Sequence, residues 1–198
     1  MTQQSRRIVT LMAAFIAGLA AVSAVIFVVA GRLPSPVPAP SAIGGPFRLV
    51  DQNGAVVTQD DLKGKPSLIF FGFTHCPDIC PTALFDMTQV YKALGRDGDK
   101  LRAFFVTVDP ERDTPEILKE YLSSFDPRLR GLTGDTAAVA AMEKAYRVYS
   151  KKVPLEAGGY TMDHTALVYL MDKEGRFVAP FNLKRKPEAA ATELKRYL

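Results

Sequence analysis

Residues 67–73, SLIFFGF, form an unbroken apolar run that is rich in aromatic and branched side chains. A run of this length without alternation is typical of a strand that is buried on both faces of a sheet. Residues 81–94 then carry apolar side chains at helical spacing, and residues 101–109, LRAFFVTVD, form a second apolar run. The sequence therefore predicts an α/β protein built on a strand–helix–strand unit, with two parallel strands and a right-handed crossover.

The segments on either side predict how this unit is completed. Before it, Asn53-Gly54 lies between two short alternating runs within residues 46–65, which is the pattern of an amino-terminal hairpin. After it the sequence predicts, in order, a helix with Pro115 in its first turn, a helix over residues 136–145, a strand within residues 146–153, two strands around a turn at Gly175, and a closing helix from Pro187. This order indicates a thioredoxin-like fold, with a central mixed sheet flanked by helices and no second domain.

The amino terminus has a different character. Residues 8–30, IVTLMAAFIAGLAAVSAVIFVVA, are 23 residues without a charge, and about 20 apolar helical residues span a bilayer. We expect a transmembrane anchor here, because the apolar core of a cleaved secretory signal, the competing interpretation, runs to only about 7–15 residues. Arg6 and Arg7 precede the run, so residues 1–7 are expected in the cytoplasm and the rest of the chain beyond the membrane.

A proline-rich linker, residues 31–45, is expected to join this anchor to one domain at residues 46–198, because GRLPSPVPAP alternates prolines with small residues. The net charge of +4 is modest, with no basic run and no alternation of aromatic and basic residues. This pattern argues against a nucleic-acid partner. The sequence also lacks a phosphate loop, a dinucleotide fingerprint and a haem-attachment motif.

Both cysteines of the chain, Cys76 and Cys80, lie in FGFTHCPDICPTAL, directly after the first apolar run. Functional residues of α/β sheets gather at the carboxyl ends of the strands, where Cys76 falls. Each cysteine precedes a proline, which disfavours helical backbone, so we expect a loop from Cys76 to Cys80 and a helix that begins at Pro81. The positive end of that helix is expected to lower the thiol pKa values and to favour thiolate, which binds soft metals and attacks disulfides.

The cysteine pair allows several functions. In an oxidising compartment, two thiols either pair or bind a ligand that keeps them apart. A purely structural disulfide would add little stability, because closing so short a loop removes little unfolded-chain entropy. The Cys-x₃-Cys spacing is wider than the common dithiol pattern, which favours a shared metal without excluding a redox-active Cys76–Cys80 disulfide. For a thioredoxin-fold peroxidase, residues 66–91 lack the lysine or arginine that would activate its cysteine.

His164, one of two histidines, lies in YTMDHTALVYL at the entrance to a strand expected at residues 165–170. In thioredoxin-like folds the loop at this place passes beside the cysteine loop, so the imidazole could complete a site of two sulfurs and one nitrogen. This set suits Cu(I), whereas zinc would need a fourth ligand, and Cu(II) could add Asp163 or water. The side chain of His75 is expected to point away from that of Cys76 and to pack beside the site.

Two aspartates follow the second apolar run, in VDPERDTPE, and so face the same end of the sheet as the cysteines. A turn residue and a helix cap would account for Asp109 and Asp113 without any further role. Alternatively, these carboxylates lie near the metal or on a docking surface. The sequence leaves both alternatives open, so Asp109 and Asp113 join Asp163 as candidates for the surroundings of the metal or for docking.

In their order and spacing, GFTHCPDICPTAL, VDPERDTPEILKEYL and MDHTALVYL closely resemble segments of the Sco/SenC family of copper metallochaperones. The resemblance covers the whole predicted domain, and the anchor and linker fit it as well. It implies a copper-binding protein with a thioredoxin-like fold, rather than an enzyme. It also implies that Cys76, Cys80 and His164 ligate copper, as Cu(I) or Cu(II), and that the family's aspartate corresponds to Asp113, with Asp109 beside it.

The resemblance implies a role and a location too. The expected role is delivery of copper to the binuclear copper centre (CuA) of cytochrome c oxidase, in subunit II, with periplasmic copper chaperones and thiol-disulfide oxidoreductases as further partners. The alternative is a thiol-disulfide reductase or redox sensor that acts on the copper-binding cysteines of the oxidase. Because no mitochondrial transit segment precedes the anchor, we expect a single-pass protein of the bacterial inner membrane, with its domain in the periplasm.

Overall fold

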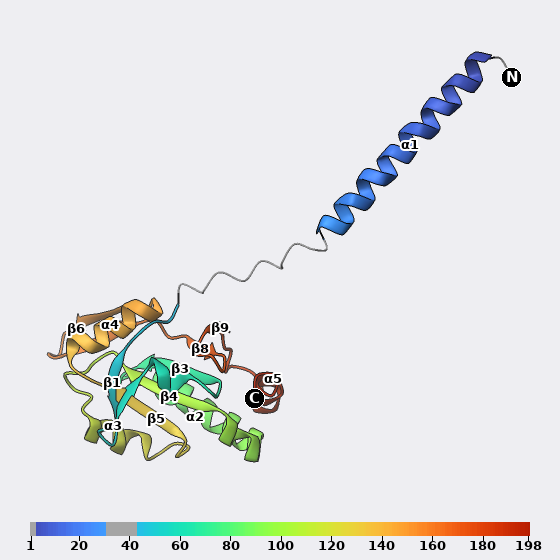
Figure 1. Ribbon diagram of the computed structural model, residues 1–198. Coiled ribbons are helices and arrows are strands. Elements are labelled where there is room, and N and C mark those ends of the chain that lie inside the picture. Colours follow the sequence, from blue (N-terminus) through green and yellow to red (C-terminus); the bar gives the residue numbers. More distant parts are fainter. Residues whose placement is uncertain (1–2, 31–42) are drawn as a thin grey trace. The chain divides into compact units, whose positions relative to one another are not determined.

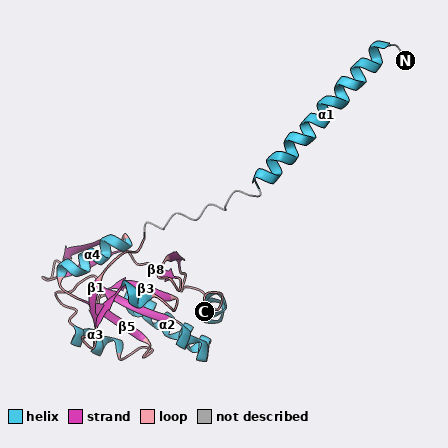
Figure 2. Cartoon of the chain, viewed as in Figure 1, coloured by secondary structure: helices cyan, strands magenta, loops and turns pink. Residues whose placement is uncertain are grey.

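The computed structural model describes residues 3–30 and 43–198 of the chain, which divides near residue 40 into two compact units (Figures 1 and 2). The first unit contains one helix, α1 (Gln3–Ala30), at the place of the predicted anchor. No helix in the described ranges is both long enough and apolar enough to cross a membrane, so the predicted transmembrane helix is not found there. Residues 1–2 and 31–42, which include most of the predicted linker, lie outside the described residues.

The second unit is built on a seven-stranded mixed sheet with the strand order β2-β1-β5-β4-β3-β8-β9, while β6 and β7 pair only with each other. Its strands are β1 (Arg48–Asp51), β2 (Val56–Thr58), β3 (Ser67–Gly72), β4 (Arg102–Thr107), β5 (Leu129–Thr133), β6 (Ser150–Pro154), β7 (Tyr160–His164), β8 (Val168–Met171) and β9 (Phe177–Pro180). Its helices are α2 (Ile79–Leu94), α3 (Pro115–Leu122), α4 (Thr136–Tyr146) and α5 (Pro187–Leu194), with 3₁₀ turns η1 (Gln59–Leu62) and η2 (Gly95–Lys100).

The central strand β3 is buried at all 6 of its residues, as the apolar run predicts. It pairs in parallel with β4 and antiparallel with β8. Phe70 faces the side covered by α2 and α3 and lies 6.2 Å from Phe105, ring centre to ring centre. Phe71 points to the other side, where its ring lies 5.7 Å from Tyr146 of α4. Helices on both faces of a mixed sheet confirm the predicted α/β class.

Local sequence signals correctly predict several elements. The turn at Asn53-Gly54 joins β1 to β2, with Gly54 at φ +79°, and Asp51 Oδ1 accepts hydrogen bonds from two backbone N–H groups of the turn. At the start of α3, the Thr114 side chain accepts a hydrogen bond from a backbone N–H, and Pro115 is the first helical residue. These elements depend on neighbours in sequence, so a local signal suffices.

Four strands differ from the prediction, two in their existence and two in their first residue. β5 carries Arg130 and Gly131, an unpromising strand sequence, but it lies between β1 and β4. β7 was expected to be a loop and instead pairs with β6 in antiparallel register. The strand expected within residues 146–153 begins only at Ser150, and the strand expected from residue 165 begins at Val168.

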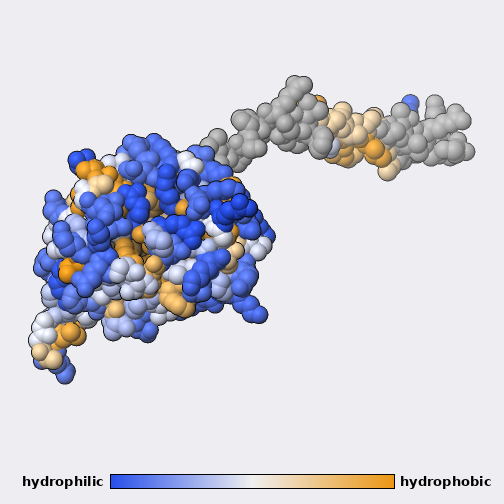
Figure 3. Space-filling view, turned by 90° about the horizontal axis from the view of Figure 1, so that it is seen from below, coloured by the Kyte–Doolittle hydropathy of each residue, from blue (hydrophilic) through white to orange (hydrophobic). Residues whose placement is uncertain are grey.

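The apolar side chains of the second unit form one continuous core. The face seen in Figure 3 is mostly hydrophilic over this unit, with only scattered hydrophobic spots. All members of the core belong to the second unit, so that unit contains its own hydrophobic interior. Cys80 is one of these members, which places one of the two thiols inside the core rather than on the surface.

Candidate metal centre

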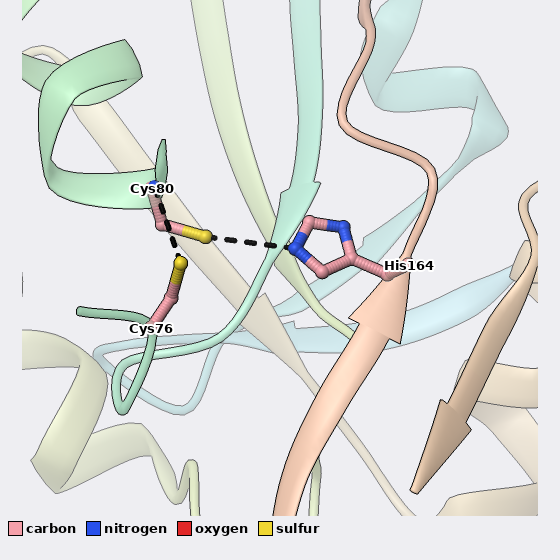
Figure 4. A group of neighbouring side chains, drawn as sticks. All are labelled: Cys76, Cys80 and His164. Atoms are coloured by element: carbon pink, nitrogen blue, oxygen red, sulfur yellow. Dashed lines mark hydrogen bonds between the residues drawn. The ribbon is translucent and has the colours of Figure 1, made fainter. Parts of the chain in front are cut away.

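Cys76, Cys80 and His164 meet beyond the carboxyl end of β3, as Figure 4 shows. Their ligand atoms, two Sγ atoms and one imidazole nitrogen, all lie within 4.8 Å of one another. Each comes from a different element: Cys76 from the loop after β3, Cys80 from the first turn of α2, and His164 from the end of β7. The structure thus brings together the three residues that the sequence analysis selects as metal ligands.

The helix that carries Cys80 begins earlier than predicted. α2 starts at Ile79 rather than at Pro81, so the expected loop from Cys76 to Cys80 is shorter and Cys80 is helical. Pro81 is tolerated because the first four N–H groups of a helix have no partner within it. The backbone N–H of Cys80 points to Cys76 Sγ, at an N–S distance of 3.4 Å. One short turn therefore directs both sulfurs to the same side (Figure 4).

The Cys80 side chain fits a recess left by a glycine. A Cβ atom at Gly72, the last residue of β3, would lie 2.8 Å from Cys80 Sγ and 2.6 Å from Phe105 Cε2. Both thiols are free, but burial raises the pKa of Cys80 well above its ordinary value. For Cys80 this corrects the expectation that the helix dipole lowers the thiol pKa. The metal-free site therefore holds a neutral thiol here, and a metal has to displace its proton.

The imidazole of His164 is oriented by a backbone carbonyl. Its Nδ1 lies 3.1 Å from the carbonyl oxygen of Thr165, which can only accept a hydrogen bond, so Nδ1 carries the proton. The lone pair of Nε2 then faces Cys80 Sγ, 3.7 Å away. Burial lowers the pKa of His164, which favours the neutral ring, and Phe73 packs edge-on at 5.7 Å between ring centres. A neutral, oriented imidazole is the form that ligates a metal.

Asp113 is fully buried and organises the backbone before the cysteines. Its carboxylate accepts hydrogen bonds from Thr74 N at 3.0 Å, Thr74 Oγ1 at 2.6 Å and Thr107 Oγ1 at 2.6 Å. Thr114, not Asp113, caps α3, so the helix-cap interpretation is wrong. Asp113 instead ties the start of the cysteine loop to the end of β4, and its burial excludes the docking-surface alternative.

Asp109 is also buried, and it joins two residues that the sequence analysis did not select. It forms an ion pair with Arg112 and accepts a hydrogen bond from the hydroxyl of Tyr160 at 2.9 Å. The only signal in the sequence is the spacing between Asp109 and Arg112, which puts opposite charges three residues apart. Tyr160 is distant in the chain, so no local pattern could have found it.

Two other candidates lie away from the ligand atoms. Asp163 is exposed and precedes His164 on β7, so the two side chains point to opposite faces of the strand. Among the described residues, the group of converging ligand atoms does not include Asp163. His75 is exposed as well, so the interpretation that its side chain is packed is wrong, and its Nδ1 lies 3.1 Å from Thr74 Oγ1.

A groove of about 510 Å³ lies beside the site, between α2 and the segments around β8 and β9. Ile79 and Leu167 line it and are 55% and 47% exposed, and they lie on the same segments as Cys80 and His164. Phe70 also lines the groove, and its ring lies 6.4 Å from the His164 ring, centre to centre. The three ligand residues are therefore bordered by an apolar, accessible surface.

The chain is similar to known proteins in both sequence and structure. Residues 36–198 match the family model SCO1/SenC. The SCO2-like protein of Rickettsia felis is 41% identical over 155 residues, which cover 77% of this chain and 76% of the relative. The structure of Bradyrhizobium japonicum ScoI with copper bound is 66% identical, with a TM-score of 0.77, over 79% of this chain and 99% of that chain.

A more distant solved structure is that of BsSco, described as a member of the Sco family of cytochrome c oxidase assembly proteins in which a disulfide switch was identified. It is 25% identical, with a TM-score of 0.63, over 81% of this chain and 96% of that chain. Together with the mixed central sheet, the similarity to these structures confirms the predicted thioredoxin-like fold.

Proposed function

Since the chain belongs to the SCO1/SenC family, we propose that it binds one copper ion through Cys76, Cys80 and His164 and passes that ion to another protein. The observation that carries this proposal is the convergence of two sulfurs and one imidazole nitrogen within 4.8 Å. Two thiolates and an imidazole suit Cu(I), which prefers soft ligands. The similar ScoI of Bradyrhizobium japonicum has copper bound, which supports the choice of metal.

The donor set fits copper better than zinc. A structural zinc site takes four protein ligands, whereas the group found among the described residues offers three. Burial raises the pKa of Cys80, so this thiol has to lose its proton when the metal binds, and binding releases a proton to solvent. His164 Nε2 already faces the sulfurs with its lone pair and needs no proton transfer. For Cu(II), water is the better additional ligand, because Asp163 lies on the other face of β7.

The acceptor that we propose is the CuA site of cytochrome c oxidase subunit II. The support is the description of BsSco, which names the family as cytochrome c oxidase assembly proteins. Cys76 is only half-buried, so the thiolates of an acceptor approach the metal from the side of the site where Cys76 lies. The neighbouring groove, with Ile79 and Leu167 exposed, gives the acceptor an apolar surface to contact. Periplasmic copper chaperones and thiol-disulfide oxidoreductases are the proposed donors and reductants.

Anchoring in the bacterial inner membrane, with the domain in the periplasm, is a separate part of the proposal. It rests on the sequence alone, because residues 8–30 lack charge and follow Arg6 and Arg7. Alkaline extraction of membranes from cells that express the full chain tests it. Retention in the membrane pellet is expected, and release into the supernatant would overturn the anchor.

A thiol-disulfide reductase is the second candidate function, and the proximity of the two free sulfurs favours it. The half-buried Cys76 would attack a disulfide of the target protein, which forms a mixed disulfide and releases the first thiol of the target. Cys80 would then attack the sulfur of Cys76 and release the second thiol of the target. The target gains two thiols, and this chain is left with a Cys76–Cys80 disulfide, so two electrons pass between them. Unlike copper binding, this exchange can proceed without His164.

Copper stoichiometry and x-ray absorption of the reduced second unit, residues 41–198, test the copper site in wild type and in His164→Ala. We expect one copper per domain with two sulfur neighbours and one nitrogen neighbour, and loss of the nitrogen in the variant. Failure to take up copper under reducing conditions would overturn the proposal. His164→Ala that keeps full function in oxidase assembly would favour the reductase instead.

A further inference from the structure

The hairpin that carries His164 is attached to the domain mainly through side chains. β6 and β7 pair with each other and do not join the seven-stranded sheet, and four of the five residues of β6 are exposed. Side chains alternate along a strand, so Tyr160, Met162 and His164 share one face of β7. Met162 is buried in the core, and the other two contact the segments at the carboxyl ends of β3 and β4. These three side chains therefore decide where the hairpin lies.

Tyr160 is held by the loop between β4 and α3 at three points. Its hydroxyl donates to Asp109 Oδ1 at 2.9 Å, and its backbone carbonyl accepts from Arg112 Nη1 at 3.0 Å. The Arg112 guanidinium also stacks on the tyrosine ring, with Cζ 3.9 Å from the ring centre. Arg112 Nε in turn donates to Asp109 Oδ2. We call the Asp109–Arg112–Tyr160 cluster the clasp.

The same loop also holds the other half of the site. The carboxylate of Asp113, four residues after Asp109, accepts hydrogen bonds from the backbone N–H and the hydroxyl of Thr74, which lies just before Cys76. At the start of the loop, the backbone N–H of Val108 donates to the carbonyl of Gly72 at 2.8 Å. One short loop thus holds both the segment before the cysteines, through Val108 and Asp113, and the hairpin of the histidine, through the clasp.

We propose that the clasp positions the nitrogen ligand, with Arg112 and Tyr160 as positioning residues for His164, an inference that rests on the proposed copper site. The clasp holds the first residue of β7, and the hydrogen bonds of Thr165 with Tyr149, at 2.9 and 3.1 Å, hold its end. Without the clasp, the start of β7 loses its direct link to the β4–α3 loop, and the half-exposed Lys152–Glu111 ion pair is left to join the hairpin to that loop. The distance from the imidazole to the sulfurs is then set by the contacts of the ring, by the burial of Met162 and by the hydrogen bonds of Thr165.

A contribution to the stability of the fold does not by itself explain why the clasp is present. The Asp109 side chain is 0% exposed and that of Arg112 24% exposed, and buried ion pairs often add no net stability over apolar residues. The domain has a cluster of the same chemistry elsewhere: Arg128 pairs with Asp126 at 2.7 Å and stacks on Tyr91 at 4.4 Å. That cluster lies before β5, at the amino ends of the parallel strands and so opposite the cysteines. It provides matched controls.

The test uses the full-length chain loaded with copper, in the variants Tyr160→Phe and Arg112→Lys, with Tyr91→Phe and Arg128→Lys as controls. Cu(II) affinity is measured by competition, and the nitrogen ligand by electron paramagnetic resonance and x-ray absorption. We expect each clasp variant to weaken Cu(II) binding about 10-fold or more, as is typical for residues that orient a metal ligand, and to change the nitrogen signal. Both control variants are expected to retain wild-type affinity and the wild-type signal.

The outcomes separate this proposal from the copper site itself. Wild-type affinity and nitrogen signal in both clasp variants would overturn the clasp alone, and so would equal losses in the controls. Loss of affinity in a variant counts as support only if its melting temperature is no lower than that of the matching control. If wild-type copper has no nitrogen neighbour that depends on His164, the proposed copper site fails, and the clasp proposal fails with it.

Discussion

The sulfur half and the nitrogen half of the proposed site are built on different foundations. Cys80 is 0% exposed and lies against the end of β3, whose residues are all buried in the core. His164 ends a two-stranded hairpin whose partner strand is mostly exposed and which is attached through the clasp, Met162 and its own ring. Buried central strands open only with the whole domain, whereas segments with few buried contacts open locally.

This difference suits a protein that must both hold and release a metal ion. The two sulfurs and the imidazole nitrogen already converge without a metal, so we expect the domain to need little reorganisation to receive copper. We expect the nitrogen to withdraw with the hairpin at a lower free-energy cost than the sulfur of Cys80, because the hairpin makes fewer buried contacts. We therefore expect metal transfer to begin with loss of the imidazole rather than of a thiolate.

Removal of one ligand from each half has the largest expected effect. Cys80→Ser is expected to weaken Cu(I) binding by more than about 100-fold, because a soft sulfur ligand is replaced by a hard oxygen ligand. Loss of a residue that only supports a ligand typically costs about 10-fold to 100-fold. His164→Ala is expected to cost less, because two thiolates still hold Cu(I). Competition with a Cu(I) chelator measures both. A larger loss in His164→Ala than in Cys80→Ser would contradict the comparison.

A smaller change tests how rigid the sulfur half is. Gly72→Ala places a Cβ atom 2.8 Å from Cys80 Sγ, and we expect it to lower the free energy of unfolding by about 1–3 kcal/mol and to weaken copper binding. Gly131→Ala is the control, because its Cβ atom would meet Leu122 Cδ1 at 2.8 Å instead. Denaturant unfolding and copper titration are measured for both. Unchanged copper affinity in Gly72→Ala would show that the sulfur moves freely.

A smaller effect is expected on the free energy of unfolding at acid pH, from the Asp126–Arg128 pair at the end of the sheet opposite the cysteines. Arg128 lowers the pKa of Asp126 through a hydrogen bond, so the carboxylate stabilises the fold fully above its ordinary pKa of about 3.9. This stability is lost as the pH falls through the lower folded pKa. Unfolding of the metal-free domain between pH 6 and pH 3 is expected to be less pH-dependent in Asp126→Asn, with copper affinity at neutral pH unchanged. Equal pH profiles would contradict it.

The smallest effect is expected from a surface ion pair on the same hairpin. Lys152 on β6 pairs with Glu111, and its Nζ lies 4.7 Å from the centre of the Tyr160 ring, but both charged side chains are about half exposed, so these contacts contribute little. Lys152→Ala is therefore expected to leave copper affinity and the nitrogen signal as in wild type. A loss comparable to that of Tyr160→Phe would mean that the whole surface of the hairpin, and not the clasp, positions His164.

The sequence predicted the two halves unequally well. The run before Cys76, the two cysteines and His164 follow from local patterns, and the structure brings them together as expected. The neutral, buried state of Cys80 could not be predicted, because it depends on how α2 packs against Gly72. α2 begins two residues earlier than the sequence predicts, because a proline in the first turn removes an N–H group that has no partner within the helix in any case.

The nitrogen half was harder to predict because its contacts are remote in sequence. Tyr160 lies 48 positions after Arg112, and nothing near either residue indicates that they meet. β7 is only five residues long and has a single fully buried residue, Met162, so its sequence gives a weak signal for a strand. Asp109 and Asp113 were recognised as candidates, but their partners, and therefore their roles, become clear only from the fold.

Native-state hydrogen–deuterium exchange of the metal-free and copper-loaded chain, followed residue by residue, tests the difference between the two halves most directly. We predict that the amides of β3 exchange only through global unfolding in both forms. Those of β7 are predicted to exchange faster in the metal-free form and to gain protection when copper binds. Equal protection of β3 and β7 without copper, or no change in β7 on copper binding, would contradict the adjustable nitrogen half that we describe.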